Sequence, residues 1–206
     1  MGIYLPNNVL YTNLIIGFCN SKNAMLFTDS RGIMKVDNGY LVYDNCKKLF
    51  RINNRLIIAA SGKFFHDEMI NEPFKDSFYN DLNIDGACEL IQGYFLDMKA
   101  LGKIMMERTY VLCGYDNQNN ICIVYIRYNE DTDEIEEQRY YGSDSDRIVA
   151  IYPPMLQIKG EDLNNLLSEY LIASNGTLPE REVIYFIEKL SEESVLLNNN
   201  VGYLKI

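Results

Sequence analysis

The chain has 206 residues and a mass of 23.9 kDa, a size that suits one domain. Its apolar share of 48% is enough for a substantial core, and its charged share of 23% does not indicate disorder. The formal net charge of −10 and the pI near 4.6 repel phosphate backbones, so nucleic acid is not expected as a partner.

The first residues, Met1 to Pro6, have no basic region followed by a long apolar stretch, so we expect no secretory signal. No segment approaches the roughly 20 apolar residues of a membrane span, and no membrane partner is expected. The five cysteines are widely spaced and form no CxxC pair, which is typical of buried thiols in a reducing cytoplasm. With a single histidine, His66, the sequence offers no metal cluster, and no cofactor is expected.

The first half of the chain predicts two β-hairpins. Their four apolar strands are 14–19, 24–28, 48–52 and 56–60, each pair joined by a polar turn. The second hairpin is expected to end at Ser61 and Gly62. The stretch 31–45 has turn residues and no clear strand pattern, and it is predicted to be looser. Strands as apolar as these indicate sheets that are covered on both faces.

The pattern then changes to a helical period over 87–101, where apolar residues recur at three- and four-residue steps. Strand patterning returns at 110–115 and 121–128. The acidic stretch 130–137 is predicted to be a solvated turn that leads to residues 138–141 (QRYY).

The last part of the chain predicts a helix over about 161–173 and a second helix that starts near Glu180. Thr177 and Pro179 precede Glu180 and resemble a capping-box start. A final strand is expected at 201–206. Strands, a helix, more strands and two helices form an α+β order, and we expect one domain spanning 1–206.

Five short motifs resemble those of proteasome β subunits, in the same order and at similar spacing. In chain order they are residues 28–31 (TDSR), 47–53 (KKLFRIN), 59–62 (AASG), 113–115 (CGY) and 142–143 (GS). The resemblance extends over roughly 12–150 and includes the bacterial proteasome-like peptidases. It implies the four-layer αββα sandwich of the N-terminal-nucleophile (Ntn) hydrolases.

The resemblance also implies a set of site residues. In that family an N-terminal threonine attacks a peptide carbonyl, and its own α-amine serves as the base. Lys48 corresponds to the lysine that keeps this amine and hydroxyl proton-poor, and Asp29 to its partner. Gly62 corresponds to the oxyanion donor, and Ser143 to a hydroxyl near the nucleophile, although Asp144 replaces the family's next glycine. From the residues alone, Asp29 and Lys48 could form only a structural ion pair, and Gly62 only a turn.

The nucleophile is the least defined of these positions. Counting back from the TDSR motif without a gap places Asn13 there, and asparagine has no nucleophilic hydroxyl or thiol. One extra residue in the hairpin turn places Thr12 there instead, which requires removal of 1–11 after a bulky tyrosine. Cys19 is a nucleophile by chemistry, but it lies within a predicted core strand.

Two main hypotheses follow for the function. The chain is a threonine-type peptidase or amidase that acts on peptides or unfolded proteins after loss of a propeptide, 1–11. Alternatively, it is a non-catalytic structural or binding subunit that keeps the same segment as an arm. Both predict a homo-oligomeric ring, with any ATPase partner unidentified. A more distant hypothesis is an acidic scaffold that binds a protein partner.

Overall fold

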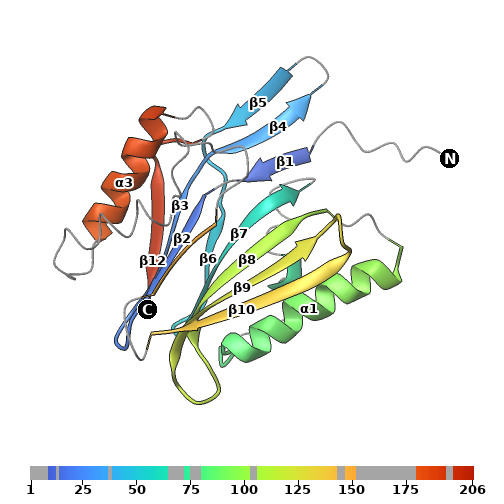
Figure 1. The fold of residues 1–206 in the computed structure, drawn as a ribbon, viewed down its shortest axis with the longest axis vertical. Coiled ribbons are helices and arrows are strands. Elements are labelled where there is room, and N and C mark those ends of the chain that lie inside the picture. The colour runs from blue at the N-terminus through green and yellow to red at the C-terminus, as the bar shows by residue number, and fades with distance from the viewer. Residues whose placement is uncertain are drawn as a thin grey trace.

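A computed structural model of the chain describes residues 9–12, 14–36, 39–64, 72–74, 80–102, 106–142, 147–151, 180–193 and 197–206. Within these ranges the protein is a mixed α/β structure with two β-sheets and two helices (Figure 1). Every pairing between the described strands is antiparallel. Neither of the two helices is long and apolar enough to cross a membrane.

The larger sheet has eight strands, with the order β10-β9-β8-β7-β1-β4-β5 and β6 paired to β7. Its strands are β1 (Val9–Thr12), β4 (Gly32–Val36), β5 (Gly39–Tyr43), β6 (Leu49–Asn53), β7 (Leu56–Phe64), β8 (Arg108–Tyr115), β9 (Ile121–Asn129) and β10 (Glu134–Tyr141). β6 pairs with residues 56–59 of β7, and β1 pairs with residues 62–64. Strand β1 therefore lies between β7 and β4, as Figure 1 also shows.

The smaller sheet has four strands in the order β11-β2-β3-β12. They are β2 (Ile15–Cys19), β3 (Ala24–Asp29), β11 (Arg147–Ile151) and β12 (Val201–Lys205). The two helices are α1 (Ile84–Ala100) and α3 (Glu180–Glu193). Helix α1 begins at Asn83, whose side chain caps it by accepting a hydrogen bond from the backbone N–H of Gly86 at 3.0 Å.

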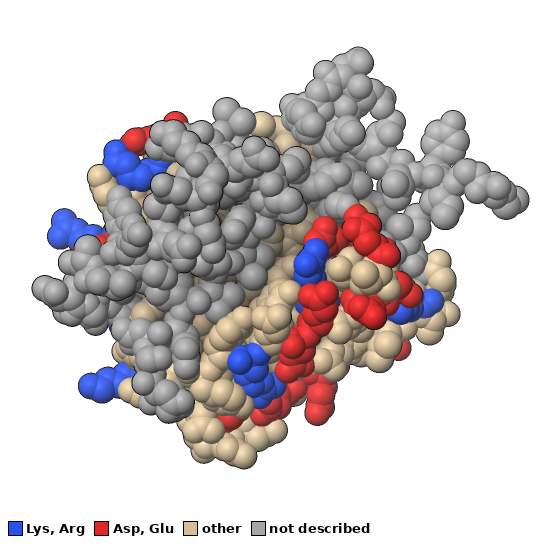
Figure 2. Space-filling model, viewed as in Figure 1, with Lys and Arg blue, Asp and Glu red and all other residues tan. Residues whose placement is uncertain are grey.

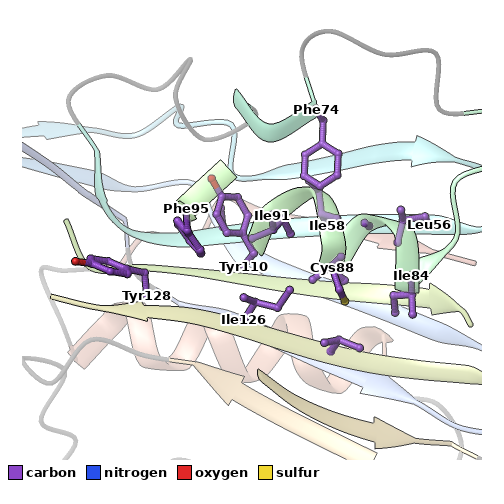
Figure 3. Close-up of a cluster of buried hydrophobic side chains, with 14 of the residues drawn as sticks. Leu56, Ile58, Phe74, Ile84, Cys88, Ile91, Phe95, Tyr110, Ile126 and Tyr128 are labelled. Carbon is purple, nitrogen blue, oxygen red and sulfur yellow. The ribbon is translucent and has the colours of Figure 1, made fainter. Parts of the chain in front are cut away.

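Three clusters of buried side chains hold these elements together. Figure 3 shows the first, in which α1 residues such as Ile91 and Phe95 face Ile58 and Tyr110 of the larger sheet. The second lies between the two sheets, where Leu26 of β3 packs in one cluster with apolar side chains of β7 and β8. The third joins α3 to the outer face of the smaller sheet.

The strictly alternating direction of strand side chains explains how one strand serves two clusters. In β7, Leu56, Ile58 and Ala60 belong to the cluster under α1, whereas Ile57 and Ala59 belong to the cluster between the sheets. Both faces of this strand are buried, which is why its sequence is continuously apolar.

Most predicted elements are confirmed, including both apolar hairpins, the helix over 87–101, the helix that starts at Glu180 and the C-terminal strand. All five cysteines are buried, as predicted. The predicted helix over 161–173 lies outside the described residues, as do Thr177 and Pro179 of the capping motif predicted for the helix that starts near Glu180.

Three predictions were wrong. The stretch 31–45 holds the hairpin of β4 and β5, because residues 32–36 and 39–43 are each short strand-like runs that pair with each other. The acidic stretch 130–137 is a turn only to residue 133, since β10 is an edge strand whose acidic side chains reach solvent. Strand β7 continues through Ser61 and Gly62 instead of ending there, and β11 was not predicted at all.

Candidate active site

A buried ion pair joins the two sheets near one end of the molecule. Lys48 Nζ lies 2.7 Å from Asp29 Oδ1, and both side chains are completely buried, at 0% exposed. Asp29 is the last residue of β3, and Lys48 immediately precedes β6. The carbonyl oxygen of Lys48 accepts a hydrogen bond from the backbone N–H of Ala60 at 3.0 Å, which fixes Lys48 against β7.

Burial changes the acidity of this lysine. Loss of hydration lowers the pKa of Lys48 below its ordinary value, and the negative charge of Asp29 opposes that change only in part. A buried ammonium that releases its proton more readily than usual is suited to influencing proton transfers nearby. The same pair also has a structural consequence, because removal of either partner leaves an uncompensated buried charge.

The carboxylate of Asp29 is oriented from its other side as well. Asp29 Oδ2 accepts a hydrogen bond from the backbone N–H of Arg31 at 2.9 Å. This is the local turn that an aspartate followed by Ser30 and Arg31 tends to form. Asp29 therefore caps a turn with one carboxylate oxygen and binds Lys48 with the other.

Gly62 lies within β7 in a conformation that favours glycine. Its φ is +127°, and a Cβ atom would lie 2.5 Å from the carbonyl oxygen of Glu107 and 2.8 Å from Cα of Arg108. Both neighbours are backbone atoms, so they cannot move aside as a flexible side chain could. The sequence at this point requires glycine for a close approach of β7 to the start of β8.

The backbone of Thr12 is paired on both sides. It lies opposite Gly62 of β7 and opposite Gly32 of β4. After Thr12 the chain leaves the larger sheet and enters β2 of the smaller one. The side chain of Thr12 and the whole of Asn13 lie outside what the structure describes. The structure thus brings the backbone of Thr12 beside Gly62, two residues along β7 from the contact of Lys48 with Ala60.

Ser143 and Cys19 were the other two candidates, and the structure describes only the second of them. Ser143 lies outside the described residues, and Gly142 before it is packed against the backbone of Asn20, with a Cβ position only 2.5 Å from that residue. Asn20 follows β2 at the end of the β2–β3 hairpin opposite to Asp29. Cys19, the alternative nucleophile, is buried at that same far end, and its thiol donates to the carbonyl oxygen of Tyr140 at 3.7 Å.

Sequence reasoning missed a polar cluster behind the ion pair. Ser30, Arg31, Asp44 and Asn198 are joined by hydrogen bonds, including one of 2.6 Å from Arg31 Nε to Asp44 Oδ1. Asp44 lies in a turn and Asn198 in a run of three asparagines, a composition typical of surface loops, so nothing in the sequence distinguished them. Across the described ranges, no group of three or more His, Cys, Asp or Glu side chains could hold a metal ion.

Comparisons with known proteins give a likeness in fold. No protein-family model matches the sequence, and no curated protein matches it either. Among solved structures, the chain is similar to Thiobacillus denitrificans BPH in complex with epoxomicin, with a TM-score of 0.60 and 9% sequence identity. The match covers 94% of this chain and 97% of that one. At such low identity the likeness concerns the fold alone.

Proposed function

We propose that this protein is a threonine-type peptidase or amidase of the proteasome β-subunit type, with the four-layer αββα fold of the Ntn hydrolases. The three buried clusters support the layer order α1, larger sheet, smaller sheet, α3. One observation carries the proposal: a fully buried Lys48–Asp29 pair lies beside the strand where Gly62 faces Thr12.

The proposed reaction needs Thr12 as the first residue of the chain. Its α-amine then takes the proton of its hydroxyl, and the oxygen bonds to the carbonyl carbon of a peptide. The backbone N–H of Gly62 stabilises the resulting oxyanion. The C–N bond breaks as the amine leaving group receives the proton, and water later hydrolyses the ester on Thr12. Lys48, held by Asp29, contributes positive charge that keeps the Thr12 amine and hydroxyl proton-poor.

The place of β1 supports peptides as substrates. Residues 9–12 fill the space between β4 and β7 as an antiparallel strand that pairs on both edges. Removal of 1–11 would leave the N–H and C=O groups of those two edges without strand partners. An extended peptide can satisfy such groups by adding a strand, whereas a compact folded protein cannot. We therefore propose peptides or unfolded proteins as the substrate class.

The same strand favours the second candidate function, a non-catalytic subunit. While Tyr11 remains attached, Thr12 has no α-amine, so the proposed base is missing. The uninterrupted pairing from Val9 to Thr12 occupies the place where a substrate strand would bind. In this alternative the Lys48–Asp29 pair has a structural role only.

Intact-mass measurement and N-terminal sequencing of the purified protein separate the two functions. The peptidase proposal predicts a chain that begins at Thr12 and cleaves fluorogenic peptides, and a Thr12→Ala variant that keeps residues 1–11. A full-length wild-type chain without activity would support the non-catalytic subunit. A Thr12→Ala variant that is still processed and active would exclude Thr12 as the nucleophile.

Self-association remains part of the proposal. Proteins of this type assemble into rings, and we propose a homo-oligomer in the cytoplasm, with an ATPase partner left unassigned. Acidic side chains gather on the face seen in Figure 2, over the region of β10 and α1. An acidic face of this kind is unsuited to nucleic acid or to anionic membrane surfaces. Light scattering that shows a stable monomer would contradict the oligomer.

A further inference from the structure

The side chain of Asn198 connects the two chain segments that carry the ion pair. Its Oδ1 accepts a hydrogen bond from the backbone N–H of Ser30 at 3.1 Å. Its Nδ2 donates to Ser30 Oγ at 3.0 Å, to Asp44 Oδ1 at 3.2 Å and to the carbonyl oxygen of Asp44 at 3.3 Å. With 8% of its surface exposed, Asn198 makes these contacts almost out of water.

Each residue that Asn198 contacts is close in the chain to Asp29 or to Lys48. Ser30 follows Asp29, and Asp44 belongs to the loop that ends at Lys48. The backbone N–H of Cys46, in that same loop, donates to the carbonyl oxygen of Ser30 at 2.8 Å. The turn after Asp29 and the loop before Lys48 are thus tied together, and Asn198 is the contribution from the far end of the chain.

We propose that Asn198 is a positioning residue for the active site: it sets the placement of the Lys48 ammonium against the Asp29 carboxylate by holding their two segments together. None of its hydrogen bonds goes to Lys48 or Asp29, so it acts through Ser30 and Asp44. Its catalytic effect rests on the proposed function, whereas its effect on the ion pair does not.

The direction of the hydrogen bonds shows why asparagine is needed. Position 198 must accept from the backbone N–H of Ser30 and also donate to two oxygens of Asp44. A carboxylate has nearly the same shape but can only accept. Asn198→Asp would keep the contact with Ser30 and place a negative charge against the carboxylate of Asp44. We expect the loop that carries Lys48 to move away from the turn after Asp29.

The experiment compares the full-length gene product, processed as the cell leaves it, with three variants. Asn198→Asp is the test. Asn20→Asp is the matched control, because the side chain of Asn20 accepts hydrogen bonds from the N–H groups of Lys22 and Asn23 at the opposite end of the hairpin, and a carboxylate can accept them as well. In the double variant Asn198→Asp/Asp44→Asn the two side chains are exchanged, so that one amide again faces one carboxylate.

Two measurements are made on each protein. The first is kcat and KM on a fluorogenic peptide. The second is the pKa of Lys48, followed by NMR of its labelled ε-carbon, which is independent of activity. For Asn198→Asp we expect kcat to fall by about tenfold or more with KM changed less than about twofold, since small displacements at a reacting centre are costly. The Lys48 pKa should rise towards its ordinary value as water reaches the loop.

The control should leave kcat and the Lys48 pKa unchanged, and the double variant should recover most of both. An Asn198→Asp protein with wild-type kcat and wild-type Lys48 pKa would overturn the inference. If that variant does not fold, failure of the double variant to restore folding would overturn it equally. If wild type is inactive but the Lys48 pKa shifts as expected, the proposed peptidase function fails while the positioning of the pair by Asn198 stands.

Discussion

The buried pair of Lys48 and Asp29 bears on the stability of the fold and, in the proposed function, on the chemistry of the site. A completely buried ammonium loses its hydration, and one carboxylate at 2.7 Å compensates for only part of that loss. A pair of this kind adds little net stability, yet it becomes very costly to break from one side. Its presence is therefore better explained by what the charge does for a neighbouring group than by stability alone.

The cost of breaking the pair can be measured by urea unfolding. Lys48→Met should lower the free energy of unfolding by about 3–5 kcal/mol, because Asp29 is left charged and buried. Asp29→Leu/Lys48→Met should be neutral or more stable by about 1–4 kcal/mol, because no charge remains. The same substitution at an exposed pair, Lys189→Met, should change stability by less than about 1 kcal/mol. The double variant should nevertheless be inactive; an active one would contradict the role of Lys48.

Gly62 allows a second prediction at this scale. Gly62→Ala should destabilise the protein by about 3 kcal/mol, since the added Cβ meets backbone at 2.5 Å and the φ of +127° disfavours any side chain. Gly93, inside α1, has nothing within 4 Å of its Cβ position, so Gly93→Ala should stabilise the protein by up to about 1 kcal/mol. Thermal unfolding of Gly62→Ala and Gly93→Ala measures both changes in stability. Equal effects at the two positions would refute the close packing at Gly62.

At the scale of elements, β1 determines whether the site is open. A chain that begins at Thr12 lacks the strand that pairs with β4 and with residues 62–64 of β7. Hydrogen exchange should become faster at 33–35 and 62–64, and an added peptide of residues 1–11 should slow it again. Residues 56–59 serve as the internal control, since β6 still pairs with them. Unchanged exchange at β4 would contradict the assigned place of β1.

Much of the element order was readable from the sequence because its strands and helices have strong periodicity. Strands β2, β3 and β7 have buried apolar side chains on both faces, and α1 repeats at helical spacing. Strand β10 was missed since it lies at a sheet edge, where exposed polar and acidic side chains interrupt the apolar signal. Strand β5 is apolar although Leu41, Val42 and Tyr43 are exposed, and the turn residues on either side of it in the sequence hid it. Asp29 and Lys48 could be paired from a resemblance, whereas the contacts of Asn198 depend on tertiary distances that no local pattern encodes.

At the scale of the whole molecule, buried thiols make the free energy of unfolding decrease as the pH rises into the alkaline range. Burial raises the pKa of Cys88 and of Cys122 from 9.0 to about 12. Between these values the unfolded chain releases protons that the folded chain keeps, so stability falls as pH rises. Lys48 acts in the opposite sense, because its lowered pKa means that the unfolded chain binds more protons.

Urea unfolding at pH 8 and pH 10.5 tests this balance. Wild type should lose more stability across the interval than Cys88→Ala/Cys122→Ala, by roughly 2–4 kcal/mol, since each thiol contributes about 2 kcal/mol at the higher pH. Comparing the change in the free energy of unfolding between the two pH values cancels the cost of the cavities that alanine leaves, because that cost is the same at both pH values. Identical slopes would show that the two thiols titrate normally in the folded protein.

We propose that Thr12, once exposed as the first residue, is the nucleophile beside Lys48 and Gly62. The purified protein is incubated with a peptide vinyl sulfone, an electrophile that bonds to activated nucleophiles, and the adduct is located by tandem mass spectrometry. We expect one adduct, on the hydroxyl of Thr12 in a chain that begins there, and none in Lys48→Met/Asp29→Leu. An adduct on Cys19, or no adduct on a properly folded protein, would contradict it.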